Sequence, residues 1–235
     1  MQLERILQKH GFGTRKDCRV MVRRERVAVN GVPCSDPFAE MPTAGLVFTV
    51  DGVDWPYAEF ASLMLNKPAG YECSRKPQHH PSVLTLLPVQ LRERDVQPIG
   101  RLDEDTTGLL LITDDGQLNH VLSSARRKVP KVYLATTRHA VDLAQVDQLL
   151  AGVQLNDEPE PISAAACVIA GPNMLRLTLT SGKYHQVKRM IAAAGNRVDA
   201  LHREAVGELA LPDDLKPGEW RWLSAVDLEK LGYSQ

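Results

Sequence analysis

GRLDEDTTGLLLITDDG, residues 100–116, places an acidic side chain, Asp103, in a loop directly before an apolar run, Leu109 to Ile112. The apolar run is typical of a buried strand, and Asp114-Asp115-Gly116 predicts a turn after it. Folds commonly present catalytic groups on a short loop that a rigid strand supports. Asp103 is therefore a candidate catalytic residue, and the alternative is a carboxylate that caps a turn and pairs with Arg101.

The composition is ordinary for a globular protein. Of the 235 residues, 43% are hydrophobic and 24% are charged, which allows a sizeable buried core. No run of about eighteen apolar residues occurs, so we expect no membrane span. The charged first residues do not fit a signal peptide. We therefore expect a cytoplasmic protein and, because the chain has no long apolar seam, a monomer.

Cysteines and histidines show no metal-binding spacing. The four cysteines stand at 18, 34, 73 and 167 without a Cys-x-x-Cys pair, and the seven histidines include no His-x-x-x-His pair. We expect reduced thiols and no metal. A phosphate-binding glycine loop is also absent, because Leu177 stands where the first glycine would precede Ser181-Gly182-Lys183. The sequence thus predicts no cofactor.

Residues 1–56 predict a small domain of their own. Apolar residues at helical spacing indicate a first helix that ends before Gly11. Thr14 can cap a second helix from about Arg15 to Arg24. Val27 to Val29 then leads to Asn30-Gly31, a pair typical of a hairpin turn.

This segment is basic although the whole chain carries a net charge of -1. Residues 1–34 hold eight Lys or Arg against three acids. Arg15, Lys16, Arg19 and Arg23 lie roughly on one side of the second predicted helix. A solvated charged face is the usual explanation of such a run, but the asymmetry between segments favours a module that binds RNA.

Residues 57–235 predict a second, larger domain in which short strands and hairpins mix with helices. Because the strands and helices do not alternate regularly, the fold class is α+β. The elements expected here are a helix after Asp142 with Leu143, Val146, Leu149 and Leu150 as its apolar face, a hairpin of Ala164–Ala170 and Leu175–Thr180, a helix from about His185 to Ala194, and a final helix capped by Ser224 and Asp227.

Four further segments, with residues 100–116, resemble the pseudouridine synthases and, among them, the RsuA family of bacterial small-subunit ribosomal RNA enzymes. They are LNKPAGYECS (65–74), HPSVLTLLP (80–88), KVYLATT (131–137) and SGKYHQVKRMIAAAGNRVDALHREAVG (181–207). The resemblance implies a catalytic domain built on a central, mostly antiparallel mixed sheet flanked by helices. Residues 1–56 resemble the small RNA-binding domain first seen in ribosomal protein S-four.

The same resemblance assigns roles to individual residues. Asp103 matches the catalytic aspartate, Tyr133 the tyrosine that packs on the target base, and Leu201 a position that lines the uracil pocket. Lys188 matches the basic partner of the aspartate, with Arg189 as the alternative. Two unit charges about 4 Å apart attract by roughly 4 kcal/mol at an effective dielectric near 20, which offsets much of the cost of burying them.

Five more side chains are expected, as a set, to contact phosphates or to hold the displaced RNA, while Asp105 and Thr106 are expected to support the catalytic loop. The set comprises Arg101, Lys131, Lys183, His185 and Arg203.

The function implied by the resemblance is isomerisation of a uridine of 16S ribosomal RNA, with uridine 516 as the family target and a precursor small-subunit particle as the partner. No cofactor is needed. Asp103 could attack the ribose, add to the uracil ring or remove a ribose proton, and the sequence leaves these open. One alternative is an enzyme of the same family that acts on 23S RNA, and another is a non-catalytic RNA-binding factor for ribosome assembly.

Overall fold

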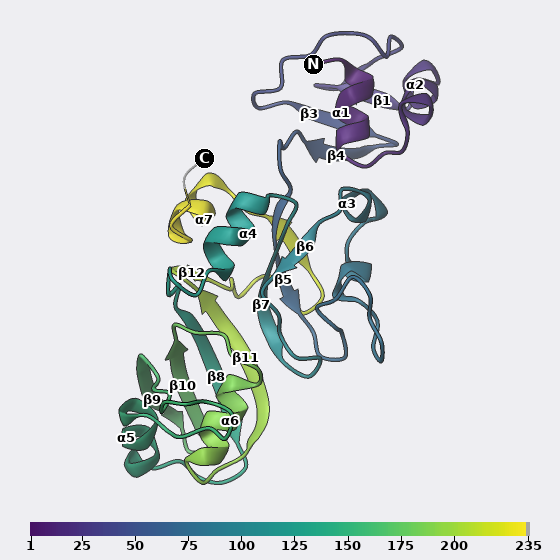
Figure 1. The fold of residues 1–235 in the computed structure, drawn as a ribbon. Coiled ribbons are helices and arrows are strands. Elements are labelled where there is room, and N and C mark those ends of the chain that lie inside the picture. The colour runs from purple at the N-terminus through teal and green to yellow at the C-terminus, as the bar shows by residue number, and fades with distance from the viewer. Residues whose placement is uncertain (234–235) are drawn as a thin grey trace. The chain divides into compact units, whose positions relative to one another are not determined.

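A computed structural model describes residues 1–233 and divides the chain into two compact units (Figure 1). The first unit comprises Met1–Ala61 and Leu87–Val96, and the second comprises Ser62–Leu86 and the described residues from Gln97 onward. The expected domain boundary after residue 56 stays a prediction. No helix within residues 1–233 is long and apolar enough to span a membrane.

The first unit combines helices with a four-stranded antiparallel sheet of order β2-β1-β3-β4. The expected capping of the second helix is confirmed, because the Thr14 side chain accepts from the backbone of Asp17 and the Asp17 carboxylate accepts from the backbone of Thr14. The elements of this unit are α1 (Leu3–Lys9), α2 (Arg15–Arg23), β1 (Val27–Val29), β2 (Val32–Pro33), β3 (Val47–Val50), β4 (Val53–Pro56) and α3 (Val89–Glu93).

The basic residues of α2 are not equivalent. Arg15, Lys16 and Arg23 are exposed. Arg19 instead pairs with the buried carboxylate of Glu4 and lies 5.1 Å from the centroid of the Phe38 ring. Arg19 therefore stabilises its own unit. The other three side chains are exposed, although Arg15 also donates to the Gln8 side chain at 3.2 Å.

His10 is almost fully buried and forms hydrogen bonds both to α1 and to the segment after β4. Its Nδ1 lies 2.7 Å from the carbonyl oxygen of Ile6, and its Nε2 accepts from the backbone N–H of Ala58 at 3.0 Å. The pKa of His10 is lowered from 6.5 to about 4, mainly by burial. The hydrogen bond to Ile6 and the charge of Glu59 oppose this shift, and the cations Arg94 and Lys9 contribute to it. A neutral imidazole, with Nδ1 as donor and Nε2 as acceptor, fits both contacts.

We expect the first unit to lose stability as the pH falls from about 6.5 to about 4. In this window the unfolded chain binds a proton at His10 and the folded unit does not, so unfolding is favoured by up to about 3 kcal/mol at the acid end. Urea unfolding at pH 7 and pH 4.5, followed through amide signals of the first unit, measures the loss. His10→Gln, which keeps an acceptor without a titrating ring, should flatten the dependence. An equal slope in this variant and in the exposed-site control His120→Gln would contradict the assignment.

The second unit is built on a nine-stranded mixed sheet of order β13-β5-β7-β11-β8-β10-β9, with β12 beside β11 and β6 beside β7. All pairings are antiparallel except β7 with β11, which confirms the expected α+β class. The elements are β5 (Ser62–Lys67), a 3-10 helix (Val83–Leu86), β6 (Gln97–Ile99), β7 (Thr107–Thr113), α4 (Gly116–Ser123), β8 (Lys131–Thr137), α5 (Leu143–Ala151), β9 (Ala166–Gly171), β10 (Met174–Leu179), α6 (Gln186–Ala193), β11 (Val198–Val206), β12 (Leu209–Ala210), β13 (Trp220–Trp222) and α7 (Ala225–Lys230).

Strand β7 lies in the interior of this sheet, between β5 and β11. Leu109 to Ile112 are at most 1% exposed, so both faces of the strand are covered. At Gly108 (φ +102°) a Cβ atom would come within 2.3 Å of the carbonyl oxygen of Arg203, so only glycine permits the parallel contact with β11. The apolar run after the Asp103 loop is therefore the rigid support that the sequence predicts.

Two helices of this unit differ from the sequence expectation. The residues Asp114-Asp115-Gly116 do not close a simple turn, because the Asp115 side chain caps α4 by accepting from the N–H of Gln117 at 2.8 Å. In α5 the expected apolar face is only half right. Val146 and Leu149 are buried, whereas Leu143 is 72% and Leu150 is 40% exposed.

Candidate active site

The loop that carries Asp103 joins β6 to β7. It turns tightly, because the N–H of Thr106 donates to the carbonyl oxygen of Asp103 at 3.1 Å. Gly100 opens the loop with φ +70°, a conformation that favours glycine. The side chain of Asp103 is 25% exposed, so it is accessible and yet largely shielded from water.

The backbone of this loop is hydrogen-bonded to a fully buried cation. Lys67, the last residue of β5, is 0% exposed. Its Nζ donates to three carbonyl oxygens, those of Pro68 at 3.1 Å, Glu104 at 3.0 Å and Thr106 at 2.8 Å. Burial lowers the pKa of Lys67, and nearby Cys73 and acidic groups of the loop oppose this. Because an ammonium group has three donors, these three carbonyl oxygens pair all of them. Two of the oxygens belong to the residues on either side of Asp105.

Two basic side chains contact the Asp103 carboxylate. Lys188 Nζ lies 3.1 Å from Oδ2, and His185 Nε2 lies 3.2 Å from Oδ1. Lys188 also contacts Asp105, at 2.6 and 2.9 Å from its two carboxylate oxygens. Of the two partners considered from sequence, Lys188 therefore reaches Asp103, whereas Arg189 pairs with Asp157.

Lys188 and the two aspartates stabilise each other's charged forms. Burial opposes the positive charge of Lys188, but hydrogen bonds and attraction from Asp105 and Asp103 outweigh it, so the pKa of Lys188 is raised. For Asp105, burial opposes the negative charge, yet the hydrogen bond and charge of Lys188 lower its pKa. The result is a cation shared between two carboxylates, one of which faces the cavities described below.

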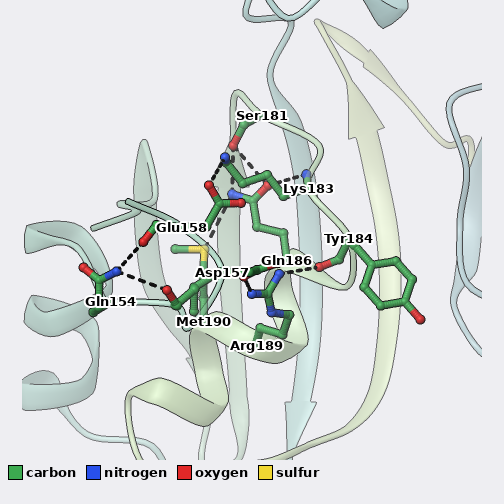
Figure 2. Close-up of polar contacts among 10 residues, drawn as sticks. Gln154, Asp157, Glu158, Ser181, Lys183, Tyr184, Gln186, Arg189 and Met190 are labelled. Carbon is green, nitrogen blue, oxygen red and sulfur yellow. Dashed lines mark hydrogen bonds and ion pairs between the residues drawn. The ribbon is translucent and has the colours of Figure 1, made fainter. Parts of the chain in front are cut away.

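The segment before α6 is held by a network of polar contacts (Figure 2). The buried Gln186 side chain accepts from the N–H of Lys183 at 2.9 Å, and Arg189 donates to the carbonyl oxygen of Tyr184 at 3.2 Å. Lys183 itself pairs with Glu158. His185 adopts a left-handed conformation, φ +46°, which is strained for a residue with a side chain.

A cavity of about 90 Å³ opens beside Asp103. Tyr133 from β8 and Leu201 from β11 line it together with Lys188 and Thr106. Thr106 is 1% exposed, and among residues 1–233 its hydroxyl has no hydrogen-bond partner. Because buried polar groups are almost always paired in folded proteins, the unpaired hydroxyl marks a place where a ligand atom would bind.

The remaining candidates from the sequence lie around this centre. Arg101 lines the 90 Å³ cavity and a second cavity of about 200 Å³. Lys131 and Arg203 line the second cavity, where burial and the charge of Arg203 lower the pKa of Lys131. Arg203 is only 2% exposed and donates to the carbonyl oxygen of Leu109 at 2.8 Å, so it can meet only groups that enter this cavity.

A third and larger cavity, about 820 Å³, also borders Asp103. The segment from Glu72 to His80 forms one part of its lining, the Asp103 loop another, and Gly182 to His185 a third. The Glu72 carboxylate accepts from the N–H groups of Gln78, His79 and His80 and thereby fixes the first of these segments.

Comparison with known proteins identifies the family. Residues 61–193 match the family described as RNA pseudouridylate synthase. The chain belongs to this family. The site described above, from the Asp103 loop to Lys188, lies inside the matched residues, whereas Leu201, Arg203 and most of the first unit lie outside them.

Curated relatives confirm the resemblance to the RsuA family. The enzyme is 46% identical over 169 residues to ribosomal small subunit pseudouridine synthase A of Yersinia pestis, covering 72% of each chain. It is 35% identical over 238 residues to the uncharacterized RNA pseudouridine synthase YtzG of Bacillus subtilis, covering 100% of both. A crystal structure of a pseudouridylate synthase with 32% identity matches with a TM-score of 0.70, over 98% of this chain and 99% of the other. The enzyme is thus an RNA pseudouridine synthase.

Sequence reasoning assigned no role to two residues of the site. Lys67 lies in the segment LNKPAG, residues 65–70. Its position at the end of an apolar strand is the sequence feature that could have indicated a buried cation. Tyr184 lies between Lys183 and His185, both of which the sequence singled out. It is 68% exposed, and its ring stacks on that of His185 with the centroids 3.8 Å apart.

Proposed function

We propose that the enzyme converts a uridine of small-subunit ribosomal RNA to pseudouridine, with uridine 516 of 16S RNA as the target and Asp103 as the catalytic carboxylate. The observation that carries the proposal is the position of Asp103, between Lys188 and His185 and at the mouth of a cavity lined by Tyr133 and Leu201. The relatives named small subunit pseudouridine synthase A support the choice of RNA.

The reaction needs a carboxylate and no redox chemistry. The bond from ribose C1′ to uracil N1 breaks, the base turns and C5 bonds to C1′. The proton on C5 is then lost to water and N1 takes up a proton, so that the product is an isomer of uridine. Asp103 would act by attack on C1′, by addition to the ring or by removal of a ribose proton. In each case the adjacent Lys188 stabilises the carboxylate before the reaction, and a water-poor cavity strengthens that interaction.

The target base must leave its neighbours before it can react. The half-buried ring of Tyr133 and the apolar Leu201 offer it a replacement for stacking, and the Thr106 hydroxyl offers a hydrogen bond to its polar edge. A hydroxyl both donates and accepts, so it suits either a carbonyl or an N–H group of uracil. The 90 Å³ cavity is thus proposed as the site of the uracil ring.

Thr106→Val is expected to lower kcat/KM by about 5- to 100-fold without destabilising the fold. A lost hydrogen bond in a buried site costs about 1–3 kcal/mol, but the hydroxyl of Thr106 has no partner within residues 1–233 that its removal would leave unpaired. Kinetics and thermal unfolding test the two parts separately. The neighbouring Thr107→Val is the matched control, because Thr107 Oγ1 lies 2.8 Å from His202 Nδ1 and its loss should destabilise the protein. Equal destabilisation by both variants would contradict the proposal for Thr106.

The first unit is proposed to hold the RNA outside the reaction centre. Arg15, Lys16 and Arg23 are exposed on α2 and suit contacts to phosphates, which position an RNA without reading its sequence. The physiological partner is proposed to be a precursor small-subunit particle in the cytoplasm, bound by a monomer of the enzyme.

Site mapping tests the proposed function. Unmodified 16S and 23S RNA, free and in precursor particles, are treated with the enzyme, pseudouridine is labelled with carbodiimide, and reverse-transcription stops are located. One new stop at uridine 516 of 16S RNA is the expected result. A stop in 23S RNA alone would keep the chemistry and overturn the target. No stop in any substrate would instead favour a factor that binds RNA without modifying it.

A further inference from the structure

The cavity of about 820 Å³ beside Asp103 is larger than the reacting base requires. Its volume lies in the range of about 300–1,000 Å³ that is usual for ligand sites. The residues that it shares with the 90 Å³ cavity are Arg101, Leu102, Asp103, Gly182, Lys183 and His185. The two cavities therefore adjoin at the Asp103 loop and at the segment before α6. A ligand that fills the smaller cavity would continue directly into the larger one.

The lining of the large cavity suits a nucleobase better than a phosphate. Ring side chains contribute at four positions, and three carboxylates outnumber the two cations of the lining, Arg101 and Lys183, of which Lys183 is already paired with Glu158. The rings are those of His79, His80, Tyr184 and His185, and the carboxylates are those of Glu72, Asp103 and Glu104. A neutral, planar group with polar edges is the chemistry that this mixture accommodates.

Tyr184 presents a stacking surface at this cavity. Its ring extends away from the polar network that anchors its backbone (Figure 2) and is 68% exposed. On its other side it stacks on His185, with an angle of 19° between the ring planes. Within residues 1–233 the Tyr184 hydroxyl has no hydrogen-bond partner, so the stacking on His185 is what holds the ring in place and its other face stays exposed.

We propose that Tyr184 and His185 form a stacking platform for the RNA base next to the target uridine, and that the 820 Å³ cavity is the subsite of this flanking nucleotide. The inference rests on the proposed function. Extraction of the uridine leaves its neighbour without a stacking partner, and the exposed face of Tyr184 supplies one. Because His185 contacts both Tyr184 and Asp103, the platform fixes the RNA next to the catalytic carboxylate.

The test compares Tyr184→Ala with Tyr184→Phe, which keeps the ring. Isomerisation is followed as tritium released from C5 in the RNA that the wild-type enzyme modifies. Because stacking on an aromatic side chain is sequence-tolerant and strong, Tyr184→Ala should raise KM by about 5- to 100-fold with kcat unchanged, and Tyr184→Phe should match the wild type. Leu143→Ala is the control, since Leu143 is 72% exposed and does not line the cavity.

A second measurement separates this inference from the proposed function. Short single-stranded RNAs carry the fluorescent base 2-aminopurine on the 5′ or the 3′ side of a uridine. One of the two should be quenched by the wild type and by Tyr184→Phe but not by Tyr184→Ala. Equal quenching and equal KM with Tyr184→Ala would overturn the platform even if the enzyme isomerises uridine. A fall in kcat at unchanged KM would also overturn it, because Tyr184 would then only hold His185. Quenching without isomerisation of any RNA would keep the platform and reject the proposed function.

Discussion

Asp103→Asn is expected to abolish pseudouridine formation while the protein stays folded. Asparagine keeps the size of the side chain but cannot attack, add to the ring or take a proton as a carboxylate does. The expected loss is on the order of 10⁴-fold or more in kcat, the scale that follows removal of a group that takes part in the reaction itself. Tritium release from C5 of uridine in the RNA measures it.

The surrounding contacts explain why the fold should survive this change. Lys188 keeps its ion pair with Asp105 when Asp103 becomes neutral, so no buried cation loses its only partner. Thermal unfolding should therefore be close to that of the wild type. Asp105→Asn is the matched control, because it removes the carboxylate that lies even closer to Lys188, 2.6 Å against 3.1 Å, and leaves Asp103 in place. Should both variants lose activity equally, Asp103 would have no special role.

Lys67→Met is expected to lower both activity and stability. The change removes the ammonium donor from the carbonyl oxygens of Pro68 and Thr106, while that of Glu104 keeps the N–H of Gly70 at 2.8 Å. The loss of these hydrogen bonds outweighs the relief from no longer burying a charge. We expect the free energy of unfolding to fall by about 2–4 kcal/mol and kcat to fall by on the order of 10²-fold, since small displacements of a catalytic group have effects of that size.

Urea unfolding and steady-state kinetics measure these two effects. The change in kcat should exceed the change in KM, because Lys67 positions the Asp103 loop and touches no RNA in the proposed mode of binding. Lys230→Met at an exposed position is the control and should be close to neutral. A variant as stable and as active as the wild type would show that the loop holds its shape without the buried ammonium group.

Local sequence signals predicted the elements whose cause is local. The four apolar residues after the Asp103 loop became the covered strand β7, and the spacing of apolar residues placed α6 correctly, with Val187, Met190 and Ile191 buried. The capping box of Ser224 and Asp227 is present as expected at the start of α7. In each case a short pattern carries the physical reason, whether a continuous apolar run, helical spacing or a cap.

The expectations that were wrong concern local structure that depends on distant parts of the chain. Asp115 and Gly116 are turn-forming residues, and no local pattern indicates that Tyr233, 118 positions later, donates to the Asp115 carboxylate at 2.6 Å at the start of α4. Leu143 matches a helical apolar face, yet no other element covers it, and it stays 72% exposed. Helical spacing alone cannot show how wide the covered face of a helix is.

Some residues of the site could likewise be predicted from the sequence, and others could not. The resemblance to a family named Asp103, Lys188, Tyr133 and Leu201, and the structure brings all four to one cavity. Lys67 could not be recognised in the same way, because its three acceptors belong to the residue beside it and to a loop 37 to 39 residues further along the chain. Only the folded backbone shows that these carbonyl oxygens converge on one ammonium group.

The parallel pairing of β7 with β11 has a consequence for protein synthesis. Thr107 and Gly108 need His202 and Arg203 as partners, and at a synthesis rate of about 5–20 residues per second those partners follow about 5–20 seconds later. The first unit, by contrast, is complete once Val96 has been made. During that interval the nascent chain has every residue of its basic domain, but its active site has not been assembled.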